Sequence, residues 1–144
     1  MTPLPHRFEV KIAGGPDGHA SVAMPGAPTL QSAPPAEFGG PGDAWSPEHF
    51  TLAAVATCFL FTLRVVAPAS RLPFTHAAVT AEGTVDRQDG TIRFTEIVLR
   101  ARVEVPPGVD HERAIRVLEK SERACLVTAS LATPVRLIPE VVVA

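Results

Sequence analysis

The chain has 144 residues, and its 13 lysines and arginines against 15 aspartates and glutamates give a formal net charge of -2. This length suits one domain with a sizeable core of its own, so we predict a single domain over residues 1–144. A nearly balanced charge provides no basic surface for nucleic acid or an anionic membrane, and neither partner is expected. Residues 1–7 contain no apolar signal segment, which predicts a cytoplasmic protein whose two cysteines are free, buried or redox-active.

The first third of the chain predicts a small hairpin followed by a long loop. Residues 6–12 alternate polar and apolar side chains as a half-buried strand does, and residues 21–24 return as a second strand after a glycine-rich turn. Residues 25–45 are rich in proline and glycine, so we expect an irregular loop with at most one short edge strand, at residues 29–31. Such a loop is either a flexible connector or a loop that docks, and Phe38 and Trp45 favour docking.

Residues 46–67 predict the long helix around which the chain is organised. Ser46 suits the N-cap, Pro47 suits the first helical position, and the Glu48 carboxylate suits the positive end of the helix dipole. We expect the helix to end at Pro68. Because its middle is apolar or small almost all the way round, we interpret it as a core helix covered on most of its surface.

The second half of the chain predicts a long hairpin, an amphipathic helix and a last strand. The hairpin turns at Asp89-Gly90, and a change of phase near residues 95–96 indicates a bulge in its second strand. Asp110 is expected to cap the helix. The apolar stripe of that helix is expected to hold Ala114, Ile115, Leu118 and Ala124, followed inward by Cys125. A short helical or coil segment at 126–133 and a strand at 135–143 complete an α+β pattern.

The motifs of several chemistries are missing, which leaves the cysteine pair as the candidate reactive site. The sequence has no HExxH or CxxC spacing for a metal, no glycine-rich phosphate loop, and no GxSxG elbow. Taken alone, Cys58 and Cys125 are each explained by packing, since free cysteine is among the most buried residue types. Two inward cysteines whose Cα atoms lie within about 7 Å can instead cycle between dithiol and disulfide without a cofactor.

A smaller and more polar side of the central helix carries the first cysteine. This side is formed by Glu48, Thr51, Val55, Cys58 and Thr62. A reactive cysteine needs positive charge or hydrogen-bond donors near its thiolate, and the middle of a helix provides no help from the dipole. The stabilising groups must therefore come from elsewhere in the fold or from another subunit.

Two stretches resemble the OsmC/Ohr family of osmotically inducible and organic hydroperoxide resistance proteins. Residues 45–59 have its Pro-Glu opening with a cysteine ten residues after the glutamate, and residues 119–131 have its second cysteine followed by serine and leucine. The resemblance implies an α+β fold in which two chains intertwine, with antiparallel sheets wrapped around two central helices. It also implies a homodimer with two active sites at the interface.

The resemblance further implies a thiol peroxidase that needs no cofactor. Cys58 would attack the hydroperoxide and become a sulfenic acid, Cys125 would condense with it to a disulfide, and an external dithiol, either a lipoylated protein or a small thiol, would reduce that disulfide. Glu48 matches the acidic residue that orients a catalytic arginine in the family. Ten residues of helix span about 15 Å, so Glu48 would serve the other subunit's Cys58. Equally, Glu48 is explained as a helix N-terminal charge.

The sequence departs from the family pattern in two places. The family's arginine precedes the central helix, but the only arginine before Arg64 is Arg7, which does not align with it, and Leu126 follows Cys125 where many members have proline. Two functions therefore stay open: a hydroperoxide reductase, or an OsmC-like protein that binds a small apolar ligand without peroxidase activity. A purely structural interaction protein explains neither the cysteines nor the long loop.

Overall fold

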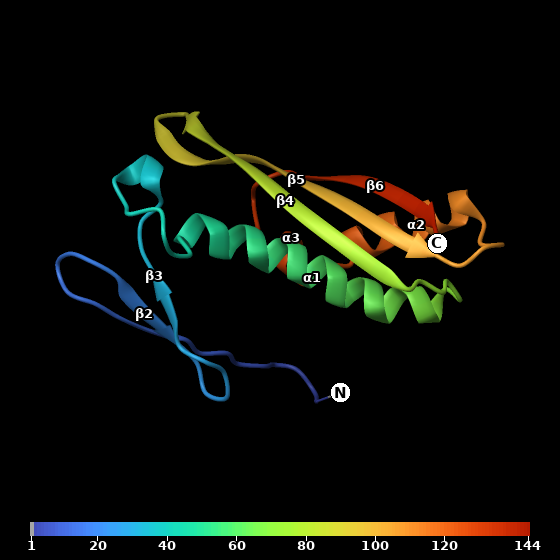
Figure 1. Ribbon diagram of the computed structural model, residues 1–144, viewed down its shortest axis with the longest axis horizontal. Coiled ribbons are helices and arrows are strands. Elements are labelled where there is room, and N and C mark those ends of the chain that lie inside the picture. Colours follow the sequence, from blue (N-terminus) through green and yellow to red (C-terminus); the bar gives the residue numbers. More distant parts are fainter. Residues whose placement is uncertain (1) are drawn as a thin grey trace. The chain divides into compact units, whose positions relative to one another are not determined.

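The computed structural model describes residues 2–144, which form two compact units, residues 2–50 and Thr51–Ala144 (Figure 1). Each unit is described by itself below. The single domain over residues 1–144 stays a prediction.

The N-terminal unit contains a three-stranded antiparallel sheet in the order β1 (Lys11–Ala13), β2 (Ala20–Ala23), β3 (Leu30–Ser32). The hairpin and the short edge strand are thus confirmed. The first strand is shorter than predicted, because β1 pairs from Lys11 opposite Ala23 onward. The next residues along β2 lead to Pro25, which has no N–H to donate, so residues 6–10 lack a strand to pair with.

The long loop of this unit folds back on itself and includes a 3-10 helix, η1 (Ala36–Phe38). The Ser32 hydroxyl donates to the Trp45 carbonyl oxygen at 2.7 Å, and the Ala33 N–H donates to the same oxygen at 3.1 Å. The Trp45 ring stacks on Phe50 with centroids 5.9 Å apart. A Cβ on Gly40 would lie 1.6 Å from the Pro34 carbonyl oxygen, so only glycine permits this close backbone approach. These contacts support the prediction of a docked loop at Trp45.

The C-terminal unit contains a sheet in the order β4 (His76–Gln88), β5 (Thr91–Val105), β6 (Val135–Val143). Figure 1 shows β4 and β5 as two long strands side by side. The predicted bulge is present, since Thr84 pairs with Glu96 and Val85 with Phe94, which leaves Thr95 unpaired. The sheet is mixed rather than wholly antiparallel, because β6 returns parallel to β5 after the helices. The predicted α+β class is confirmed.

The helices are α1 (Pro47–Ala69), α2 (His111–Arg123) and the short α3 (Leu126–Ala129). Ser46 and Asp110 cap α1 and α2 as predicted: the Ser46 hydroxyl accepts from the His49 N–H, and the Asp110 carboxylate accepts from the Glu112 N–H. The expected end of α1 at Pro68 is wrong. A proline in the last turn removes only its own backbone hydrogen bond, and the Ser70 N–H still reaches the Val66 carbonyl oxygen.

The inward stripe of α2 also differs from the prediction at its end. The helix stops at Arg123, so Ala124 becomes its exposed C-cap residue instead of a core residue. The buried positions of α2 are Ala114, Val117, Leu118 and Ser121, whereas the predicted Ile115 is only half-buried.

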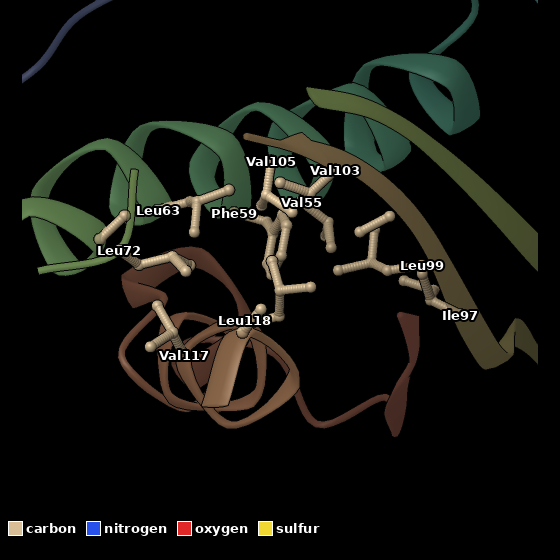
Figure 2. Close-up of a cluster of buried hydrophobic side chains, with 13 residues drawn as sticks. Val55, Phe59, Leu63, Leu72, Ile97, Leu99, Val103, Val105, Val117 and Leu118 are labelled. Carbon is tan, nitrogen blue, oxygen red and sulfur yellow. The ribbon is translucent and has the colours of Figure 1, made fainter. Parts of the chain in front are cut away.

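The core of the C-terminal unit lies between α1, α2 and β5. Figure 2 shows side chains of α1 and α2 that point toward one another, beside those of β5. The contribution of α1 is a stripe at four-residue spacing: Val55, Phe59, Leu63 and Ala67. By length and composition alone α1 would also suit a membrane span, but this stripe makes it a core helix.

Within one chain, however, α1 is covered on one side only. Phe61 is 53% exposed and Val65 is 70% exposed, although both are apolar. The expected cover on most of the helix surface is therefore not supplied by the C-terminal unit alone.

Candidate active site

The structure places Cys58 and Cys125 on different elements of the C-terminal unit. Cys58 lies half-buried in the middle of α1, next to the fully buried Phe59. Cys125 is buried, but it is not part of α2 as predicted. It follows the C-cap residue of α2 and is itself the N-cap residue of α3.

These two predicted site residues are brought into contact. The Cys125 thiol lies close enough to the Cys58 sulfur to act as a donor that lowers the pKa of Cys58, and both cysteines are free. Because helix α2 ends just before Cys125, the chain turns there and directs the thiol and the following backbone toward α1.

The surroundings of Cys58 favour its thiolate. Burial by itself raises the pKa of this thiol, but four hydrogen bonds outweigh that effect and lower the pKa overall. The donors are the Cys125 thiol, the Val127 N–H, the Thr62 hydroxyl and the Leu126 N–H. The Thr62 Oγ1 lies 4.0 Å from the Cys58 Sγ. Within residues 2–144, no charged group contributes to this shift.

Sequence reasoning did not identify the backbone donors, although a signal for them exists. The first N–H groups of any helix have no partner inside it, and a short helix begins directly after Cys125. The stabilising groups that the predicted site lacked therefore come from the segment that holds the second cysteine.

The two thiols are perturbed in opposite directions. Burial raises the pKa of Cys125, and its hydrogen bond to Cys58 raises it further, while Thr128 lowers it by a smaller amount. Cys58 is therefore the better thiolate of the pair and Cys125 the hydrogen-bond donor to it.

We expect this asymmetry in alkylation rates. The rate at which iodoacetamide modifies Cys58 rises with pH through the thiol pKa, because only the thiolate attacks. Its midpoint should lie below the ordinary value of 9.0 and that of Cys125 above it. Peptide mass spectrometry across pH 6 to 11 measures both. Replacing Cys125 with alanine should move the Cys58 midpoint upward, whereas the Cys125→Ser control keeps a hydroxyl donor and should move it less.

An apolar hollow of about 650 Å³ opens beside Cys58. Its wall on α1 includes Ala54, Phe61 and Val65, and its wall on the other side includes Leu126 and Val127. A molecule with an apolar body can therefore lie against α1 with a reactive group at the sulfur.

The third predicted residue, Glu48, belongs to the N-terminal unit. It lines a separate apolar hollow of about 780 Å³, together with Ile12, Val22, Phe38 and Phe50. Its Oε1 atom is buried and has no hydrogen-bond partner among residues 2–144. Glu48 lies outside the C-terminal unit that holds both thiols. In the described part of the chain, no three His, Cys, Asp or Glu side chains gather as a metal site requires.

The fold and the paired thiols define an α+β protein with a dithiol site on a long core helix. The chain matches the OsmC-like protein family over residues 40–140, and it belongs to that family. The predicted resemblance is thereby confirmed.

Similar proteins extend this comparison. The chain is 27% identical to the uncharacterized protein YmaD of Bacillus subtilis (strain 168) over 100 aligned residues, and this alignment covers 67% of each chain. The fold of the present chain matches that of an OsmC-like protein from Mycoplasma pneumoniae with a TM-score of 0.82, at 14% identity over 96% of this chain and 99% of that one. The fold also matches the organic hydroperoxide resistance protein OsmC from Legionella pneumophila with a TM-score of 0.76, at 23% identity over 97% of this chain and 99% of that one. At these identities the two structures establish the fold.

Proposed function

We propose that the protein is a thiol-dependent hydroperoxide reductase with Cys58 as the reactive cysteine and Cys125 as the resolving cysteine. The observation that carries the proposal is the hydrogen-bonded thiol pair in which the pKa of Cys58 is lowered. The name of the Legionella relative as an organic hydroperoxide resistance protein adds support. The apolar hollow beside Cys58 suits an organic hydroperoxide, whose apolar body would lie along α1.

The reaction follows from the chemistry of a poised thiolate. The Cys58 thiolate attacks the terminal oxygen of the hydroperoxide, the O–O bond breaks, and the alkoxide that leaves takes up a proton to become an alcohol. Cys58 then carries a sulfenic acid. Cys125 attacks its sulfur, the S–O bond breaks, and water leaves as the disulfide forms. An external dithiol, a lipoylated protein or a small thiol, restores the pair by exchange in the cytoplasm.

We propose that the working form is a homodimer. The exposed Phe61 and Val65 on α1 support it, since an apolar helix face of this kind needs a covering surface. Glu48 supports it too, because a buried carboxylate oxygen without a donor is costly and a second chain can bring one. In that arrangement Glu48 would orient a cation at the partner's thiolate. A helix N-terminal charge remains the other account of Glu48.

One experiment tests the proposal directly. The reduced protein is treated with one equivalent of cumene hydroperoxide, and the products are analysed by intact mass and by non-reducing peptide mapping. We expect a loss of two hydrogens and a peptide pair joined through Cys58 and Cys125. If neither a disulfide nor a dimedone-trapped sulfenic acid forms on Cys58, the proposal is wrong.

The second candidate is a protein that binds a small apolar ligand and does not reduce peroxides. The large apolar hollow in the N-terminal unit favours it. This function predicts that an apolar fluorescent probe is bound by the reduced protein while Cys58 stays inert to hydroperoxide.

A further inference from the structure

Thr128 carries a buried hydroxyl that makes no hydrogen bond to residues 2–144 while both cysteines are free thiols. Its Oγ1 atom is shielded from solvent, and within the described chain, residues 2–144, it has no hydrogen-bond partner. Buried hydroxyls are nearly always paired, so an unpaired one requires an explanation. Thr128 lies on the four-residue helix α3, which begins directly after Cys125.

The position of Thr128 relative to Cys125 supplies the explanation. Cys125 is the N-cap residue of α3 and Thr128 is the third residue after it, the spacing at which a cap side chain faces the third residue of its helix, although the neutral Cys125 side chain makes no cap hydrogen bond. Both the hydroxyl and the backbone N–H of Thr128 lie close enough to the Cys125 sulfur to favour its charged form.

The protonation state of Cys125 decides whether that hydrogen bond is made. A neutral thiol sulfur is a weak acceptor, so the hydroxyl gains little from it and stays unpaired. A thiolate is a charged acceptor, and hydrogen bonds to charged acceptors are about twice as strong as neutral ones. The hydroxyl is therefore placed for a partner that exists only after Cys125 loses its proton.

We propose that Thr128 is a positioning residue for the resolving cysteine: its hydroxyl donates a hydrogen bond to the Cys125 thiolate while that thiolate attacks the sulfenic acid on Cys58. In this step the S–S bond forms and the S–O bond of Cys58 breaks. The hydroxide that leaves takes up the proton that Cys125 released, so one water is produced. Thr128 keeps its own proton throughout.

The site needs such a group on the side of Cys125. Burial and the neighbouring Cys58 both raise the pKa of Cys125, so its attacking form is scarce near neutral pH. The donors that stabilise the Cys58 thiolate are different ones, namely Thr62 and the N–H groups of Leu126 and Val127. Thr128 thus affects the second chemical step without acting on the first.

The inference rests on the proposed peroxide reduction, and its test separates the two chemical steps. Wild type, Thr128→Val and Thr128→Ser are oxidised with one equivalent of cumene hydroperoxide, quenched with acid or dimedone at increasing times, and analysed by peptide mass spectrometry. The appearance of sulfenic acid on Cys58 reports the first step, and the Cys58–Cys125 disulfide reports the second.

We expect Thr128→Val to form the disulfide about tenfold more slowly, because it loses one hydrogen bond to a charged group. The pH midpoint of disulfide formation should move upward, and oxidation of Cys58 should keep its wild-type rate. Thr128→Ser retains the hydroxyl and should restore both the rate and the midpoint. Thr128→Val should fold normally, since it removes an unpaired buried hydroxyl with little change of shape; Thr128→Ala is a second variant without the hydroxyl.

The outcomes distinguish the two proposals. If Cys58 is not oxidised in wild type, the proposed function fails. If Cys58 is oxidised but the valine and alanine variants form the disulfide with the wild-type rate and pH midpoint, the role of Thr128 is overturned. The role is also overturned if Thr128→Ser and Thr128→Val slow disulfide formation equally and neither moves its pH midpoint, because Thr128 would then act only through packing.

Discussion

Replacing Cys58 with serine is expected to abolish hydroperoxide reduction, with a fall in turnover of about a thousandfold or more. The sulfur of Cys58 is the atom that the surrounding donors favour as a thiolate, and a serine hydroxyl at the same place keeps its proton near neutral pH. Residual cumene hydroperoxide measured over time, with dithiothreitol or dihydrolipoamide as reductant, provides the readout.

The matched control is Cys125→Ser, which changes the same atom in the partner thiol. This variant should consume one equivalent of hydroperoxide at a rate close to wild type, because serine retains a donor toward Cys58, and should then stop as a sulfenic acid without a disulfide. A Cys58→Ser protein that still turns over, or a Cys125→Ser protein that fails in the first equivalent, would contradict the assigned order of the two cysteines.

Local sequence signals were sufficient for most of the elements because each one has a local cause. Alternation, a turn dipeptide and a shift of phase define the β4–β5 hairpin and its bulge at Thr95. The caps at Ser46 and Asp110 follow from side chains that accept hydrogen bonds from the first N–H groups of a helix.

The errors arose where distant parts of the chain decide the outcome. Residues 6–10 alternate like a strand, yet a strand needs a partner, and the turn at Pro25 removes it. The direction of β6 depends on the path of α2 and α3 between the strands, and the alternation of apolar residues within a strand does not predict that path.

The candidate site was predictable in its cysteines but not in its electrostatics. The family motifs identify Cys58 and Cys125, and the structure places them close enough for each to shift the pKa of the other. The donors to Cys58 include backbone N–H groups of Leu126 and Val127, which have no signature in side-chain identity. For Glu48 the sequence predicts a role in orienting a cation, but the structure leaves its buried Oε1 atom without a hydrogen-bond partner among residues 2–144.

Replacing Phe59 with alanine should lower the free energy of unfolding by about 3–5 kcal/mol, the usual cost of removing a buried aromatic side chain and leaving a cavity. Phe59 is fully buried in the core of the C-terminal unit, where α1, α2 and β5 meet (Figure 2). Urea unfolding followed by circular dichroism at a fixed protein concentration measures the change. A loss below about 1 kcal/mol would contradict this core.

Phe61→Ala is the matched control, since it makes the same chemical change two residues further along α1. In one chain Phe61 is 53% exposed, so the loss should be small, within about 0.5 kcal/mol, if the protein unfolds as a monomer. If a second copy covers this face, Phe61→Ala should cost more, and the midpoint of unfolding should rise with protein concentration because association stabilises the folded state by mass action. Measuring both variants at several concentrations therefore separates the core inside one chain from the cover that we propose a second chain supplies.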